Sequence, residues 1–253
     1  MKNKTIDKNK IARERQEIAV MSKQNLELWI PKTEIGKKVK AGEITDLGQM
    51  LDNGVKILEE QIIDSLLPDI QSQLLKIGQS KGKFGGGKRS IWKQTQKKTS
   101  EGNKPKFSTM VVIGNKDGFI GIGRGKAKET VPAREKALRR AKLNIIKIKR
   151  GCGSWECACK EPHSIPFKVK GKCGSVIVEL IPAPKGTGLT VEAECQRILS
   201  LAGIKDLFSR CSGQTSSKLN LMEACFDALC NLSKVRLQAR FIEPLGVKDG
   251  KIK

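Results

Sequence analysis

Residues 107–144 read FSTMVVIGNKDGFIGIGRGKAKETVPAREKALRRAKLN, and they predict a β-hairpin followed by a helix. The runs 107–114 and 118–123 are rich in β-branched residues, and the Asn-Lys-Asp-Gly sequence between them supplies the residue types of a tight turn. From about Val131 the apolar positions take a helical spacing, and Pro132 is tolerated in the first turn. We therefore expect two antiparallel strands and then a helix that ends near Asn144.

Glycines leave one face of the second strand without side chains. Gly121, Gly123 and Gly125 alternate along it, and Arg124, Lys126 and Lys128 supply positive charge beside them. One interpretation is that a phosphate backbone lies on the bare face, and the other is that the strand packs tightly on a helix. A dinucleotide site is not expected, because the sequence predicts no parallel β-α-β unit here and Lys-rich sequence stands where the acidic residue is required.

Weaker patterns extend from this centre in both directions. Upstream, the sequence indicates a basic extension, an amphipathic helix from Val55 to Pro68, a second helical piece over 70–77 and a strand over 90–97. Downstream, it indicates strands over 145–150, 164–170, 175–181 and 204–208, with helices over 193–202 and 219–232.

Basic residues are concentrated in the middle of the chain. The 253 residues carry a formal net charge of +23, and the segment 81–150 alone holds 21 basic and 4 acidic residues. Positive charges at such a density repel one another unless a polyanion neutralises them, so nucleic acid is the expected partner. Aromatic residues make up 4% and tyrosine is absent, which favours contact with phosphates and folded RNA over base stacking.

Neither a leader segment nor a membrane partner is expected. The N-terminal residues are charged, and the longest apolar runs, such as VIVELI, are only long enough for strands. We expect a soluble cytoplasmic protein whose eight cysteines are reduced.

Catalysis is not expected either. In GKFGGGKRS, Gly82, Gly87 and Lys88 match part of a phosphate-binding loop, but Arg89 replaces the hydroxyl residue that binds magnesium. A flexible basic linker is the alternative interpretation. The chain has one histidine and scattered carboxylates, so we expect neither an enzyme nor a small-molecule substrate.

The segment GCGSWECACKEPH, residues 151–163, contains three cysteines and the only histidine of the chain. Cys152, Cys157, Cys159 and His163 have the spacing C-x4-C-x-C-x3-H, and four such ligands suit one tetrahedral zinc ion. Two alternatives remain open. The cysteines are reduced structural residues while His163 caps a turn, or one thiol is a nucleophile, although a nucleophile would not need three thiols.

Three blocks of the sequence resemble the small-subunit ribosomal protein five family in its archaeal form. They are VVIGNKDGFIGIGRGKAKETVPAREKALRRAKLNIIKIKRG at 111–151, GKCGSVIVELIPAPKGTGL at 171–189 and LAGIKDLFSR at 201–210. The blocks stand in the family's order. The cysteine-rich segment is similar to that of the archaeal branch.

This resemblance implies an α+β fold in two domains. The first is similar to a double-stranded-RNA-binding domain, with the order α-β-β-β-α, and the second is a small α+β domain with a left-handed β-α-β crossover. The implied organisation is a basic N-terminal extension (1–53), the first domain with leading helices (54–150), the Cys/His linker (151–163), the second domain (164–240) and a tail (241–253).

The same resemblance implies a function. It is that of a structural constituent of the small ribosomal subunit, which binds rRNA near the decoding region and near the channel through which messenger RNA enters, and supports translational accuracy. The implied partners are small-subunit rRNA, small-subunit ribosomal proteins four and eight, and messenger RNA at that channel. The alternative is a free-standing zinc-dependent RNA-binding regulator or chaperone.

The residues expected to bind RNA are all basic and lie between 89 and 150. Several of them belong to segment 96–107, which the resemblance implies is a loop that reaches rRNA. The full set is Arg89, Lys93, Lys97, Lys98, Lys104, Lys106, Arg124, Lys126, Lys128, Arg139, Arg140, Lys147 and Arg150.

Overall fold

A five-stranded sheet is built around the predicted hairpin. In the computed structural model, which describes residues 28–79, 89–157 and 159–250, β5 (Gly102–Gly114) and β6 (Phe119–Ala127) pair antiparallel. Their turn is tight because the Asn115 side chain accepts hydrogen bonds from the backbone N–H groups of Asp117 (2.8 Å) and Phe119 (3.1 Å). Gly118 supplies the positive φ, 88°, that the turn requires. The prediction of this hairpin is confirmed, although β5 begins earlier than expected.

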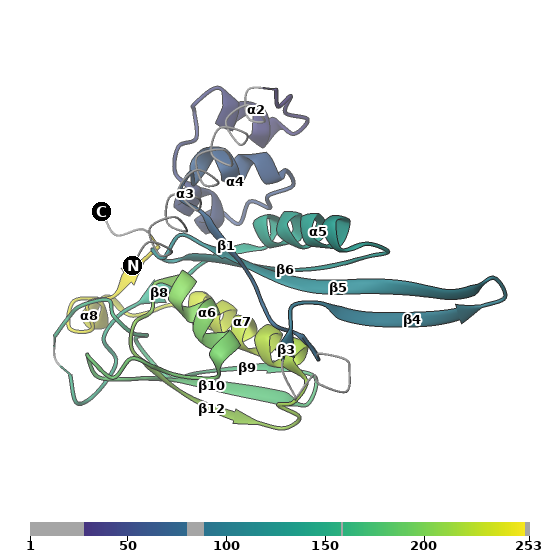
Figure 1. The fold of residues 1–253 in the computed structure, drawn as a ribbon. Helices are drawn as coiled ribbons and strands as arrows, with labels where there is room; N and C mark the ends of the chain where they lie inside the picture. Colours follow the sequence, from purple (N-terminus) through teal and green to yellow (C-terminus); the bar gives the residue numbers. More distant parts are fainter. Residues whose placement is uncertain (1–27, 80–88, 158, 251–253) are drawn as a thin grey trace, which may run out of the picture.

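Three more strands complete this sheet (Figure 1). β1 (Gln71–Leu74) and β4 (Lys93–Thr99) both pair with β5, and β7 (Ile145–Lys147) pairs with β6. β4 and the first half of β5 form a long ribbon that projects beyond the rest of the sheet. Segment 96–107 is therefore a pair of strands with a short turn rather than the expected loop.

Helix α5 (Thr130–Leu143) lies close to one face of the sheet because the strand beneath it lacks side chains there. A Cβ atom on Gly121, Gly123 or Gly125 would stand 2.3, 2.2 or 1.9 Å from the carbonyl oxygens of three alanines of α5. Two residues apart, strand positions are separated by about 6.8 Å, and four residues apart, helix positions are separated by about 6 Å. Because these spacings are nearly equal, all three glycines meet an alanine of the helix. The interpretation that this face is bare for a phosphate backbone is wrong, and the close packing of strand on helix is confirmed.

We expect Gly123→Ala to lower the free energy of unfolding by about 3 kcal/mol, because the new methyl group overlaps the carbonyl of Ala137 and α5 must move. The control is Gly48→Ala in α3 (Leu47–Asp52), where a Cβ meets only side-chain atoms, the nearer at 3.9 Å. This control is expected to gain up to about 1 kcal/mol. Urea denaturation measures both variants, and an unchanged midpoint for Gly123→Ala would contradict the packing argument.

A second sheet follows the cysteine-rich segment. Its order is β11 (Leu189–Thr190), β12 (Leu207–Ser212), β10 (Val176–Pro182) and β9 (Val169–Cys173). β11 and β12 are parallel and are connected through α6 (Ala193–Ala202), which makes a β-α-β unit. The helix ends where predicted, because Gly203 adopts a left-handed φ of 85°. α7 (Lys218–Lys234) packs on β9 and β10.

One buried cluster joins the two α+β units. Met110, Ile120 and Ile122 of the first sheet belong to the same cluster as Leu199 and Leu201 of α6. These sheet residues lie on the face opposite α5, so α6 covers that face at its inner end. The outer end of the same face, on the projecting ribbon, extends beyond the helices (Figure 1).

Helices precede the first sheet where the sequence indicated mainly a basic extension. α2 (Glu34–Lys40), α3 and α4 (Glu60–Leu66) bury Trp29, Met50 and Ile63 in a second cluster together with α5. Each helix has only one or two turns, too few for a helical period to be read from the sequence. The predicted helix from Val55 begins only at Glu60. The predicted helical piece 70–77 is wrong, because it contains strand β1, whose partner β5 is distant in sequence.

Short elements complete the fold. α8 (Ala239–Ile242) precedes β13 (Lys248–Asp249), which pairs with β8 (Lys149–Arg150), so the expected tail takes part in the structure. β2 (Gly78–Gln79) pairs with β3 (Arg89–Ser90). The first part of the predicted extension, residues 1–27, and the glycine-rich motif with Gly82, Gly87 and Lys88 lie outside the described residues.

Candidate nucleic-acid interface and metal cluster

One face of the first sheet carries six of the predicted RNA-binding residues. Residues paired directly across neighbouring strands point to the same side, and the register pairs Lys97 with Lys104 and pairs Ser108 with both Lys93 and Lys126. This side is opposite α5, because the alternate positions hold the glycines that contact the helix. We call these six exposed cations the basic face: Lys93, Lys97, Lys104, Lys106, Arg124 and Lys126.

The protein itself leaves much of this positive charge uncompensated. Lys97 and Lys104 stand directly opposite each other, and like charges in such a pair are destabilising. Lys104 has an ion pair with Glu101 beside the exposed turn. Within the described part of the chain, Lys93, Lys97 and Lys106 form no ion pair with a carboxylate. A polyanion with regularly spaced phosphates would relieve this repulsion.

A cleft beside the basic face adds residues that the sequence did not indicate. It has a volume of about 350 Å³ and is lined by Arg89 and Lys93 on one side and by Ser216 and Ser217, just before α7, on the other. Hydroxyl groups and the N–H groups at the start of a helix are common donors to phosphate oxygens. The two serines were missed because only the tertiary structure brings the start of α7 beside β4.

Other predicted cations lie on different surfaces. Lys98 points to the reverse side of the ribbon, and Lys128, Arg139 and Arg140 are exposed on or near α5. Arg139 forms an ion pair with Glu60 at 3.2 Å. These four residues therefore do not belong to the basic face.

Two predicted RNA-binding residues are engaged inside the protein. The Arg150 side chain is 3% exposed, and its Nη2 atom contacts Asp117 at 2.7 Å and the carbonyl oxygen of Gly250 at 2.9 Å. Lys147 is 14% exposed and pairs with Asp52 at 2.8 Å. Because Arg150 is buried and both charges are compensated by carboxylates, both residues are removed from the candidate interface. They fasten β7 and β8 to neighbouring segments instead.

The four predicted metal ligands come together in the structure. One potential ligand atom from each of Cys152, Cys157, Cys159 and His163 lies within 4.8 Å of the other three. Tetrahedral zinc with Zn–S bonds of about 2.3 Å requires sulfur atoms roughly 3.8 Å apart, so the cluster needs only a small contraction. The donor set of three sulfurs and one nitrogen fits zinc.

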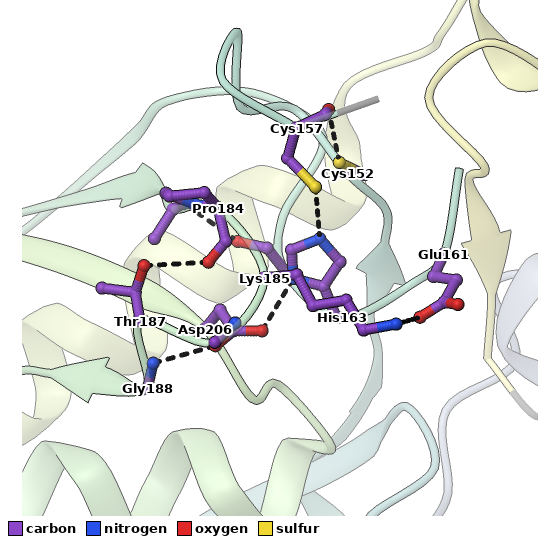
Figure 2. Close-up of polar contacts among 12 residues, drawn as sticks. Cys152, Cys157, Glu161, His163, Pro184, Lys185, Thr187, Gly188 and Asp206 are labelled. Atoms are coloured by element: carbon purple, nitrogen blue, oxygen red, sulfur yellow. Dashed lines mark hydrogen bonds and ion pairs between the residues drawn. The ribbon is translucent and has the colours of Figure 1, made fainter. Parts of the chain in front are cut away.

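His163 is oriented for this role by a carboxylate. Its Nδ1 atom contacts Oδ2 of Asp206 at 2.9 Å, and its Nε2 atom lies 3.9 Å from the sulfur of Cys157 (Figure 2). A proton on Nδ1 is therefore shared with Asp206, which leaves the Nε2 lone pair directed at the cysteines. Asp206 was not predicted, since it lies 43 residues from His163 in the sequence.

The surroundings of the thiols differ. The backbone N–H of Lys185 favours the thiolate form of Cys157 and lowers its pKa to about 6. Burial raises the pKa of Cys152 to about 11. A divalent cation among the sulfurs would replace their protons. Cys173, Cys195, Cys211, Cys225 and Cys230 are free thiols outside this cluster.

Comparison with known proteins places these features in one family. The model "Ribosomal protein S5, N-terminal domain" matches residues 91–149, and "Ribosomal protein S5, C-terminal domain" matches residues 171–240.

In the described part of the chain, no helix has the length and apolar character to cross a bilayer.

Similar proteins match over most of their length. "Small ribosomal subunit protein uS5" of Nanoarchaeum equitans is 49% identical over 228 residues, which are 90% of this chain and 98% of that protein. The protein of the same name from Methanocaldococcus jannaschii is 44% identical over 228 residues, again 90% and 98%. That of Staphylothermus marinus is 45% identical over 217 residues, 86% of this chain and 94% of the other. With both domain models matched in order and identity sustained across nearly the whole of these relatives, the chain belongs to the ribosomal protein S5 family.

Proposed function

We propose that the chain is a structural constituent of the small ribosomal subunit and that it binds small-subunit rRNA through the basic face. The observation that carries this proposal is the register of β4, β5 and β6, which gathers six exposed cations on one face of the first sheet, four of them on the projecting ribbon. The names of the relatives support the same assignment. The proposal gives the chain no catalytic step.

The mechanism is electrostatic and geometric. Each lysine or arginine that neutralises a phosphate releases condensed counterions, which drives binding and makes it depend on salt. The Gly–Ala packing of β6 on α5 keeps the sheet rigid beneath the cations. The cluster shared by the two units keeps the start of α7 beside the ribbon, so that rRNA contacts a surface of fixed shape.

The proposal also includes the position of the chain in the small subunit and the proteins that it contacts there. The chain would lie near the decoding region and the channel through which messenger RNA enters, contact ribosomal proteins four and eight, and support accurate translation in the cytoplasm. Its first unit, with β4, β5, β6 and α5 in succession, is compatible with a double-stranded-RNA-binding-like domain. The β11-α6-β12 unit is where we propose the left-handed crossover. We keep the division 1–53, 54–150, 151–163, 164–240 and 241–253 as part of this proposal.

Zinc is the proposed occupant of the Cys152–Cys157–Cys159–His163 cluster. The ion would supply four bonds that fasten segment 152–163 to itself, and Asp206 holds its histidine ligand in place. The expected role is structural, because all four protein ligands of a tetrahedral ion are present.

Sedimentation tests the ribosomal assignment. We expect the chain to remain with small subunits through high-salt washes, because many phosphate contacts and neighbouring proteins hold it in a buried position. A free-standing RNA-binding regulator would be removed by the same salt. Quantitative mass spectrometry of washed subunits gives the ratio of this chain to the other subunit proteins. A ratio that falls well below one per subunit would contradict the proposal and favour the regulator.

A further inference from the structure

Asp206 connects the metal cluster to a loop of the second sheet (Figure 2). Its Oδ2 atom contacts Nδ1 of His163 at 2.9 Å, while its Oδ1 atom accepts hydrogen bonds from the backbone N–H groups of Gly186 at 3.1 Å and Gly188 at 2.8 Å. Asp206 and His163 are each 5% exposed. One buried carboxylate therefore forms hydrogen bonds with the imidazole through one oxygen and with the loop through the other.

Residues 184–188, here called the Asp206 loop, need these hydrogen bonds. Gly186 and Gly188 both have positive φ, 93° and 74°, and glycine explores such conformations freely when nothing holds it. Within the loop, the hydroxyl of Thr187 donates to the carbonyl oxygen of Pro184 at 2.9 Å. The bonds to Asp206 hold the N–H groups of both glycines, and the carbonyl oxygen of Gly188 also accepts from the backbone N–H of Leu207 at 3.0 Å.

The loop also approaches the cluster through Lys185. Its ammonium group pairs with Glu161 at 2.7 Å, two residues before His163 in the sequence. The Asp206 loop is thus connected to the cysteine-rich segment twice, by Lys185 to Glu161 and through Asp206 to His163.

We propose that a metal ion bound by the cluster fixes the conformation of the Asp206 loop, with Asp206 as the positioning residue that transmits the effect. The inference rests on the metal binding proposed above. A metal ion on Nε2 requires the imidazole proton on Nδ1, and this places His163 and Asp206 in one fixed arrangement. Without the ion, Asp206 still accepts the Nδ1 proton, but no bond fixes the Nε2 side of the ring among the sulfur atoms, so the ring and Asp206 can move together. The side chain of Lys185 is 57% exposed, so the ion also determines where the loop presents this cation to an anionic partner.

Hydrogen exchange on the full-length chain, read by mass spectrometry, tests the coupling. Removing zinc with a chelator should raise the exchange rates of the Gly186 and Gly188 amides by about tenfold or more. In Asp206→Asn the amide nitrogen donates to Nδ1 and favours the tautomer with the proton on Nε2, so zinc affinity should fall by about 10- to 100-fold. In this orientation the amide oxygen of the variant still accepts from the loop without the ion, so the exchange of Gly186 and Gly188 should no longer depend on zinc.

The matched control is Asp227→Asn in α7. Asp227 accepts the backbone N–H of Lys172 at 3.0 Å and has no contact with the cluster. This variant should keep both its zinc affinity and the zinc dependence of Gly186 and Gly188. If the chain binds one zinc ion and exchange in the loop does not change when zinc is removed, the coupling is refuted while the metal site stands. If Asp206→Asn binds zinc as tightly as the unmodified chain, the role of Asp206 is refuted. If no zinc binds, both proposals fall.

Discussion

Cys157→Ser is expected to eliminate the binding of one zinc ion per chain. At a free zinc concentration about 1,000 times the dissociation constant, it should also lower the free energy of unfolding by about 4 kcal/mol. The reason is that a ligand bound only by the folded state stabilises that state. Structural zinc sites bind tightly enough for the free zinc concentration to exceed the dissociation constant by this factor. Serine retains the size of the side chain but replaces a thiolate ligand with a poorly coordinating hydroxyl.

Two measurements check this result, the zinc content of the purified chain and its urea denaturation with and without chelator. The control is Cys173→Ser, which changes a half-buried thiol outside the cluster whose hydrogen bond to Glu223 at 3.2 Å a hydroxyl can retain. That variant should retain its zinc. Equal zinc contents in Cys157→Ser and the unmodified chain would leave the structural-cysteine interpretation of residues 152–163 standing.

The sequence predicts those parts of the fold whose determinants are local. The hairpin of β5 and β6 follows from its turn residues, and the end of α6 follows from Gly203. Strand β1 was mistaken for a helix because four residues of mixed polarity become a strand only through their pairing with β5. The same reasoning explains α2 and α3, which are stabilised by the apolar cluster that they cover rather than by a long helical pattern.

The residues of the candidate site also fall into those that local sequence reveals and those that only the tertiary structure reveals. The four metal ligands are close in sequence, so their spacing alone revealed the cluster. Asp206 has no such pattern, because its partnership with His163 exists only after the second sheet has formed. The count of basic residues predicted an RNA partner, but it did not distinguish Lys97, which is exposed on the basic face, from Arg150, which is buried against Asp117. Burial and strand register make that distinction, and a charge count contains neither.

The double variant Lys97→Gln and Lys104→Gln is expected to weaken binding to small-subunit rRNA by about 10- to 100-fold at 0.1 M salt. The slope of log affinity against log salt should become shallower by about 2, one for each phosphate contact removed. The physical reason is that both side chains project from the basic face with little competing negative charge. Filter binding or fluorescence anisotropy across a salt series gives both quantities.

The same double variant should not destabilise the free protein, and this separates a role in binding from a role in folding. Lys97 and Lys104 repel each other across the strand pair, so removing both charges should raise the free energy of unfolding by about 0.2–1 kcal/mol. Affinity and stability are thus expected to change in opposite directions. Lys37→Gln with Lys38→Gln removes the same charge from exposed positions on α2 and should leave the salt slope nearly unchanged. An equal loss of affinity in both double variants would mean that net charge, rather than the basic face, determines binding.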